Sequence, residues 1–107
     1  MVVISLKNGW RIRERFPQRI PVIVYPRNNT IKQIDKQKYL VPEDITFGQF
    51  VYIVRKRLKL ADTEALFLFT EKNTIPPSSE LFSVIDHKYR SSAGYVVVYY
   101  SFESVFG

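Results

Sequence analysis

Residues 36–60 read KQKYLVPEDITFGQFVYIVRKRLKL and place a short basic strand, a turn at Pro42 and one strongly amphipathic helix in direct succession. Thr46, with Gln49 three residues later, is typical of a capping box, in which each side chain satisfies a free backbone amide of the other residue. The helix is therefore expected to begin at about Phe47, and the rest of the chain to form a sheet against it.

The predicted helix carries one apolar stripe and one apolar residue beside it. The stripe recurs at helical spacing and consists of Phe47, Phe50, Val51, Val54 and Leu58. This width suits a helix that packs on a sheet, and the Lys and Arg residues near the end of the helix match the helix dipole. Ile53 lies about 60° around the helix from Phe50, which indicates a second apolar surface.

The composition bounds the class of protein. The chain has 107 residues, 46% of them hydrophobic, which is enough for one domain with a single core. Without cysteine it has no disulfide, thiolate zinc site or cysteine nucleophile. Its longest apolar run, residues 95–100, is far shorter than the ~20 residues that span a membrane. We expect a protein that is soluble as made and resides in the cytosol or nucleus.

The charge is concentrated in the first part of the chain. Residues 1–60 carry thirteen Lys or Arg and four Asp or Glu, whereas residues 61–107 carry three and six. A basic surface can bind nucleic acid, anionic lipid or acidic peptides. Trp10 beside Arg11, Arg13 and Arg15 resembles a basic-aromatic patch for nucleic acid or a membrane, but we favour a surface helix on which Trp10 and Ile12 pack on one side.

Two structures are open for the N-terminal segment. Asn8 and Gly9 form a turn signal, and Asn8 is alternatively the cap of a brief helix that runs to Phe16.

Four segments have the composition of strands. β-Branched and aromatic runs predict strands at 20–25, 34–41, 65–70 and 95–100. The first two are neighbours and predict a hairpin that ends at Pro42. Lysines along residues 34–41 have a structural explanation as well, because Lys protects an exposed strand edge from unwanted pairing.

A second, shorter helix is predicted before the last strand. Ser78 or Ser79 is expected to cap it, with Leu81, Phe82 and Ile85 facing inward and an end near residues 87–90. The element order is then strand, strand, helix, strand, helix, strand. This order is typical of the β-grasp fold, in which the first and last strands pair in parallel at the centre of the sheet.

Catalytic patterns are absent from the sequence. His87 is the only histidine, the acidic residues are scattered, and neither a phosphate-binding glycine loop nor a nucleophile elbow occurs. We therefore expect no enzyme, no metal site and no cofactor, and interpret His87 as a helix-end surface residue. Gly107 is the one chemical candidate, because a terminal glycine has no side chain to obstruct activation of its carboxylate. It suggests a tag that other proteins attach to an amine.

Five stretches together resemble the GABARAP-type autophagy modifiers, which are ubiquitin-like proteins. They are RIPVIVY (19–25), DKQKYLVPEDITFGQFVYIVRKRLKL (35–60), FLF (67–69), IPPSSELFSVI (75–85) and YYSFESVFG (99–107). The resemblance implies an α+β ubiquitin-like β-grasp with a four-stranded mixed sheet, a main amphipathic helix, a short second helix and a shortened N-terminal helical extension. We expect the extension at 1–18, the ubiquitin-like domain at 19–101 and a flexible tail at 102–107.

The resemblance implies conjugation through Gly107 to phosphatidylethanolamine. The expected partners are E1-like and E2-like enzymes and a processing or delipidating cysteine protease, and the expected location is the cytoplasm and, after lipidation, the autophagosomal membrane. Nucleic acid is not expected as a partner.

The resemblance also implies a groove for cargo receptors and adaptors with acidic-flanked aromatic-x-x-aliphatic peptides. The implied aromatic pocket comprises Ile12, Pro21, Lys36, Lys38, Leu40 and Tyr95. The implied aliphatic pocket comprises Tyr39, Val41, Pro42, Ile45, Phe50, Ile53 and Val54. The implied basic rim that faces the acidic flank comprises Arg19, Lys36, Lys38 and Arg57.

Two alternatives remain open at this stage. The first is an unconjugated module that uses the same groove, and only a test of Gly107 separates it from the modifier. The second, less favoured, is a basic nucleic-acid-binding domain that depends on Arg11, Arg13 and Arg15.

Overall fold

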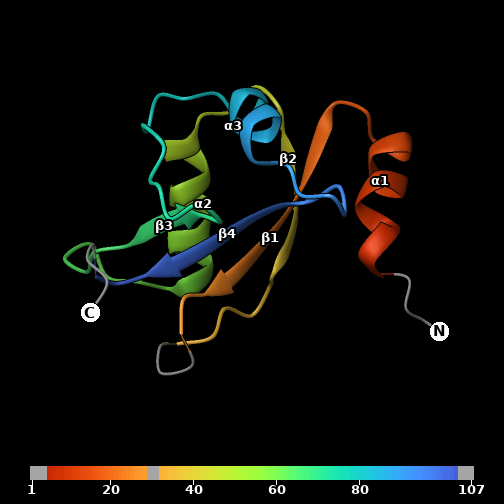
Figure 1. Ribbon diagram of the computed structural model, residues 1–107. Helices are drawn as coiled ribbons and strands as arrows, with labels where there is room; N and C mark the ends of the chain where they lie inside the picture. Colours follow the sequence, from red (N-terminus) through yellow and green to blue (C-terminus); the bar gives the residue numbers. More distant parts are fainter. Residues whose placement is uncertain (1–4, 29–31, 104–107) are drawn as a thin grey trace.

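The computed structural model describes residues 5–28 and 32–103 (Figure 1). The elements follow in the order α1 (Ser5–Arg15), β1 (Arg19–Pro26), β2 (Lys38–Pro42), α2 (Phe47–Leu58), β3 (Phe67–Thr70), α3 (Phe82–Tyr89) and β4 (Val96–Ser101). The four strands form one mixed sheet in the order β2-β1-β4-β3. The predicted β-grasp fold is confirmed, with β1 and β4 parallel at the sheet centre and the β1–β2 pair antiparallel.

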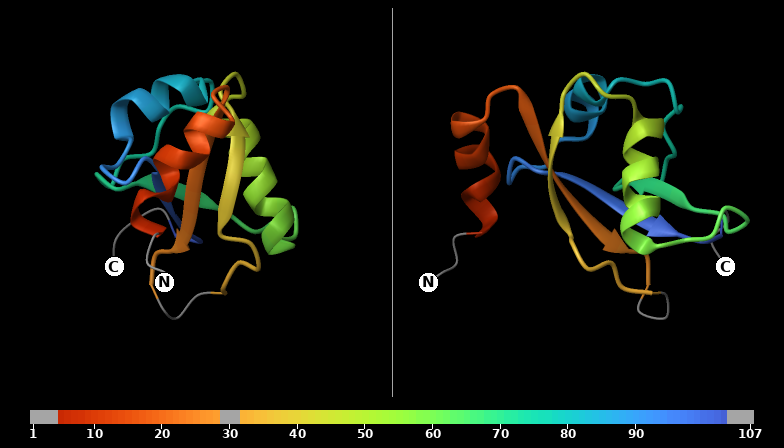
Figure 2. Two further views of the ribbon diagram at one scale, coloured as in Figure 1. Left: turned by 90° about the vertical axis from the view of Figure 1, so that its right-hand side faces the viewer. Right: turned by 180° about the vertical axis from the view of Figure 1, so that it is seen from behind.

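The helices lie on both sides of the sheet. Figures 1 and 2 show α2 and α3 on one side and α1 on the other. The core fills the space between the sheet and helices α2 and α3. Its fully buried side chains include Val22, Val24, Phe50, Val54, Leu58, Phe82, Ile85, Val96, Val98 and Tyr100.

Helix α2 begins as the sequence predicts. The Thr46 hydroxyl accepts from the Gln49 backbone N–H at 3.1 Å, and Gln49 Oε1 accepts from the Thr46 backbone N–H at 2.8 Å. Both bonds of the capping box are present, so two of the free amides at the helix start are satisfied. The helix ends at Leu58, and the C-cap Lys59, in a left-handed conformation, donates its backbone N–H to carbonyls of the last turn.

The predicted start of α3 is wrong. Its N-cap is Leu81, not Ser78 or Ser79, and no side chain caps it. Leu81 is paired with Thr46 in an isolated antiparallel bridge, so its backbone is extended and the helix cannot begin before it. The Leu81 side chain is 43% exposed rather than inward, while Phe82 and Ile85 are buried as predicted.

Further boundaries differ from the prediction. Strand β2 begins only at Lys38, and it includes Pro42, which pairs with Arg19. The other strand boundaries differ from the prediction as well, because β1 is Arg19–Pro26, β3 begins only at Phe67 and β4 is Val96–Ser101. The N-terminal segment is a helix from Ser5, so Asn8 and Gly9 lie inside it and form neither a cap nor a turn.

Candidate functional site

Strand β2 forms one edge of the sheet. Within the described part of the chain, its only strand neighbour is β1, so its outer backbone N–H and C=O groups face away from the sheet. Tyr39 and Val41 point into the core, whereas Lys38 and Leu40 alternate with them and are exposed. Such an edge can accept an extended peptide as a further strand.

A cavity of about 330 Å³ lies beside this edge. The structure brings all six residues of the predicted aromatic pocket to it, and Tyr39 as a seventh: Ile12, Pro21, Lys36, Lys38, Tyr39, Leu40 and Tyr95. They come from α1, β1, the segment before β2, β2 itself and the residue before β4. Three regions distant in sequence therefore build one pocket.

Two lysines approach aromatic rings of this pocket. Lys36 Nζ lies 5.1 Å from the Tyr39 ring centroid, and Lys38 Nζ lies 5.8 Å from that of Tyr95. The Tyr39 hydroxyl donates to the Lys36 carbonyl at 2.7 Å, which ties the segment before β2 to the strand. Burial raises the pKa of the Tyr39 and Tyr95 hydroxyls above their ordinary values, so both stay neutral at physiological pH. The positive charge of the pocket therefore belongs to the lysines.

The predicted aliphatic pocket is only partly assembled as one surface. Ile45 and Ile53 line an open groove of about 620 Å³ along α2, and Ile53 is 39% exposed. Four of the predicted residues lie in the core instead: Tyr39, Val41, Phe50 and Val54. Pro42 lines a neighbouring cavity together with Arg19.

Sequence reasoning missed several residues of this groove. They are Thr46, Gly48, Gln49, Tyr52 and Ser78. Tyr52 is 57% exposed, and with Gln49 and Ile53 it follows the i, i+3, i+4 spacing that places side chains on one helix face. That spacing was available in the sequence as a signal, whereas the position of Ser78 was not.

The basic rim is unevenly available. Arg19, Lys36 and Lys38 are exposed, although Arg19 Nη1 is 3.5 Å from the Leu40 carbonyl. Arg57 forms an ion pair with Asp35 at 3.2 Å, and both side chains are largely exposed. The charge of Arg57 is thus partly offset before any partner arrives.

The N-terminal arginines do not form one free cluster. Arg11 and Arg15 are exposed, but Arg13 is 16% exposed and forms an ion pair with Asp86. A nucleic-acid surface built on all three arginines would have to break this pair.

Other chemical sites are not evident in the described ranges 5–28 and 32–103. No group of three or more His, Asp or Glu is arranged to hold a metal ion there, and none of the helices in those ranges is long and apolar enough to cross a membrane. His87 is exposed on α3. Gly107, the predicted conjugation residue, lies outside the described residues.

Comparisons with known proteins point in one direction. A family model described as "Autophagy protein Atg8 ubiquitin like" matches residues 5–107. Autophagy-related protein 8a of Arabidopsis thaliana is 50% identical over 98 residues, which cover 91% of this chain and 80% of that protein. Autophagy-related protein 8b of the same plant is 48% identical over 105 residues, with 97% and 85% covered. A crystal structure of Trypanosoma brucei ATG8 superposes with a TM-score of 0.84 at 39% identity, over 96% of this chain and 89% of that one.

Proposed function

The chain belongs to the Atg8 family of autophagy-related ubiquitin-like proteins, and from this premise we propose that it is a lipid-conjugated modifier that recruits cargo receptors. In this proposal, Gly107 is joined to phosphatidylethanolamine on autophagosomal membranes. The peptide groove beside β2 then binds receptors and adaptors that carry an acidic-flanked aromatic-x-x-aliphatic motif.

One observation carries the peptide-binding part of this proposal. The pocket beside the open edge of β2 contains all six residues expected of an aromatic pocket. An extended peptide that adds to β2 gains backbone hydrogen bonds from the edge, and its side chains supply specificity. The aromatic anchor enters the pocket between Ile12 and Tyr95, and the aliphatic anchor contacts the groove at Ile45 and Ile53.

Charge favours acidic segments beside the aromatic anchor. Lys36 and Lys38 are exposed on the pocket itself, and Arg19 is exposed at the other end of β2. Exposed charges of this kind speed encounter and fix the register of the peptide more than they add affinity. Peptides with Asp or Glu before the aromatic residue are therefore the expected ligands.

The conjugation part of the proposal rests on family membership and on the terminal glycine. An E1-like enzyme uses ATP to activate the Gly107 carboxylate, and the glycine acyl group passes to an E2-like enzyme. The amine of phosphatidylethanolamine then attacks this acyl group, forms the amide and releases the E2-like enzyme. A cysteine protease exposes the glycine or later releases the lipid. The chain itself supplies the acyl group and the groove, so the protein moves from the cytoplasm to the membrane when it is conjugated.

Two measurements test the two parts separately. Titration with an acidic-flanked Trp-x-x-Leu peptide is expected to shift the NMR signals of Lys38, Leu40 and Ile53, whereas those of Val84 on α3 stay unchanged. In cells, Gly107→Ala is expected to abolish the lipidated, membrane-sedimenting form. Persistence of that form in the variant would disprove conjugation through Gly107, and an unshifted β2 would disprove the groove.

A further inference from the structure

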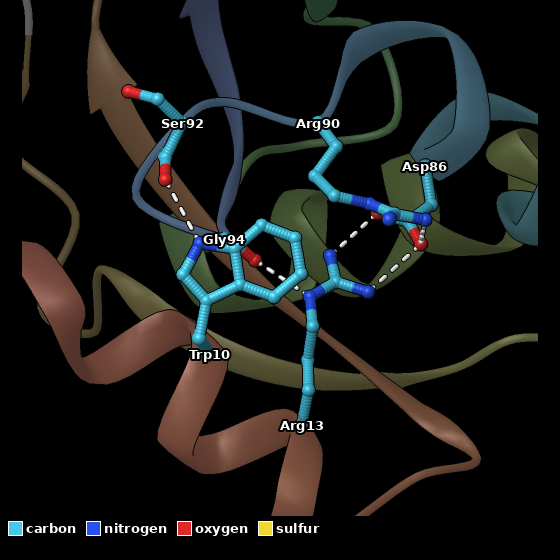
Figure 3. A network of polar contacts seen from close by, with 6 residues as sticks. All are labelled: Trp10, Arg13, Asp86, Arg90, Ser92 and Gly94. Atoms are coloured by element: carbon cyan, nitrogen blue, oxygen red, sulfur yellow. Dashed lines mark hydrogen bonds and ion pairs between the residues drawn. The ribbon is translucent and has the colours of Figure 1, made fainter.

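Helix α1 is attached to the rest of the protein by a cluster of polar contacts (Figure 3). Trp10 Nε1 donates to the Ser92 carbonyl at 2.8 Å. Arg13 Nε donates to the Gly94 carbonyl at 2.8 Å, and the two Nη atoms of Arg13 donate to the Asp86 carboxylate at 2.9 and 2.5 Å. One guanidinium therefore bridges α1 to both α3 and the loop before β4.

Asp86 is the centre of this cluster. It is 6% exposed, and Arg90 Nη2 donates to its Oδ2 atom at 3.0 Å. Two guanidinium groups offset the cost of burying one carboxylate, and the bidentate geometry of Arg13 fixes direction as well as distance. The Trp10 ring lies beside both arginines, with its centroid 5.5 Å from Cζ of Arg13 and 5.6 Å from Cζ of Arg90.

The backbones of α1 and the loop before β4 are in direct contact. A Cβ atom at Gly9 would lie 2.4 Å from the Ala93 carbonyl oxygen, so only glycine allows this approach. Gly94 has a φ of +87°, which glycine adopts without strain, and a Cβ there would lie 2.7 Å from the backbone nitrogen of Trp10. The backbone contact thus sets how closely the helix and the loop can approach, and the Arg13 hydrogen bonds keep them from moving apart.

Residues 9–15 of α1 contribute little buried apolar surface. Among residues 9–15, whose side-chain burial the structure describes, only Gly9 is buried. Ile12 is half-buried and Trp10 is 43% exposed, and neither belongs to the hydrophobic core. An amphipathic helix normally docks by burying an apolar stripe, whereas residues 9–15 of α1 are attached mainly through the polar cluster.

The attachment adjoins the aromatic pocket on both sides. Ile12, which lines the pocket from α1, precedes Arg13 in the chain. Tyr95, which also lines the pocket, follows Gly94. The Arg13 bond to the Gly94 carbonyl therefore joins the chain neighbours of two pocket residues, Ile12 and Tyr95, and the bonds to Asp86 hold the same guanidinium in place.

We propose that Asp86 is a positioning residue of the peptide groove: by anchoring Arg13, it holds Ile12 of α1 at the separation from Tyr95 that admits an aromatic side chain. This inference rests on the proposed peptide-binding function and adds a residue that does not touch the peptide. Asp86 acts on aromatic recognition and leaves the aliphatic groove on α2, to which it contributes no side chain, unchanged.

The test compares two peptides on matched variants. Acidic-flanked Trp-x-x-Leu and Ala-x-x-Leu peptides are titrated by calorimetry against the wild-type protein, Asp86→Asn, Arg13→Met and the control Lys88→Met. Lys88 lies on the same helix in an exposed ion pair with Glu80 and has no contact with the cluster. If loss of the Arg13–Asp86 pair leaves the aromatic pocket correctly formed in only about a tenth of the molecules, affinity for the Trp peptide falls about tenfold. Affinity for the Ala peptide, which does not use the pocket, is unchanged.

Two further measurements separate positioning from general damage. Trp10 is the only tryptophan, so the exchange rate of its indole N–H reports release of α1, and amide exchange in α2 reports the core. Arg13→Met keeps Arg90 as a counter-charge for Asp86, so it remains informative if Asp86→Asn does not fold. Asp86→Glu is expected to recover most of the preference for Trp over Ala.

The possible outcomes are distinct. A wild-type protein that does not bind the Trp peptide contradicts the proposed function itself. A wild-type protein that binds it, with folded variants that keep the wild-type ratio between the two peptides, overturns the positioning role. An equal loss of affinity for both peptides also overturns it, because a residue that acts only on the aromatic pocket must change the ratio of the two affinities.

Discussion

Helices α1 and α2 lie on opposite sides of the sheet and are attached in different ways. Helix α2 buries Phe50, Val54 and Leu58 completely. Helix α1 depends on Arg13, which is hydrogen-bonded to Asp86 and Gly94. Apolar burial is non-directional and grows with area, whereas a bidentate ion pair acts at one position and one protonation state. The fold therefore depends on α2, and the shape of the aromatic pocket depends on how α1 is held.

The largest expected effect is on the apolar attachment. Phe50 has no exposed surface, and its ring lies edge-on to Tyr39 at 5.6 Å and to Phe82 at 5.1 Å. Phe50→Ala is expected to lower the free energy of unfolding by about 3–5 kcal/mol, because it removes buried area and leaves a cavity. Urea-induced unfolding measures this change. Tyr52→Ala, on the exposed face of the same helix, should change it by less than ~0.5 kcal/mol, and similar losses for both variants would contradict the contrast between these faces.

Acid should affect α1 before it affects α2. Burial disfavours the charged Asp86 carboxylate, but the hydrogen bonds and charges of Arg13 and Arg90 outweigh it, so the pKa of Asp86 is held below its ordinary value. Because the pKa of Asp86 is lower in the folded than in the unfolded protein, its ionised carboxylate stabilises the attachment fully above the unfolded-state pKa of about 4. This stabilisation is lost as the pH falls through the pKa of the folded state.

We therefore expect protection of the Trp10 indole N–H, after correction for intrinsic exchange, to be constant from about pH 7 to 5 and to fall below about pH 4. Hydrogen exchange measured by NMR across this range checks the expectation, with Phe50 and Val54 amides as the reference for α2. Asp86→Asn should show no such transition. A loss of Trp10 protection already between pH 7 and 5 would mean that another group controls the attachment.

The smallest expected effect concerns the helix caps. Thr46→Ala removes the hydroxyl that accepts from Gln49 and should destabilise the protein by about 1 kcal/mol. Ser79→Ala should have an effect below ~0.5 kcal/mol, because Ser79 is exposed and α3 begins at Phe82, after the N-cap Leu81, without a side-chain cap. Thermal unfolding of the two variants checks the difference. An equal loss of stability in both variants would mean that Ser79 does cap α3.

Helix α2 and the succession of strands and helices along the chain could be predicted because their signals are local. The Thr46–Gln49 box and the apolar spacing from Phe47 to Leu58 depend on neighbours within a few residues. The predicted start of α3 failed although Ser78 and Ser79 are good capping residues, because the bridge between Leu81 and Thr46 overrides local preference.

The candidate site was predicted unequally for a related reason. Alternation along β2 separates exposed Leu40 from buried Tyr39, which a period of two shows directly. Along α2 the sequence shows which residues share a face, but not where the sheet stops covering that face. Phe50 and Val54 are therefore in the core, whereas Ile53 and Tyr52 line the groove.

Patterns in the sequence thus establish the β-grasp order, the amphipathic helix and the alternating edge strand, since the spacing of side chains along the backbone is a property of each element alone. The attachment of α1 is different, because Arg13 meets Asp86 across 73 positions and Gly9 meets Gly94 only when β1 and β4 are paired. A buried carboxylate, two guanidinium groups and two glycines have no common spacing that would reveal them. Their interaction exists only in the folded chain, where burial makes an unpaired charge costly and leaves no room for a side chain between the backbones.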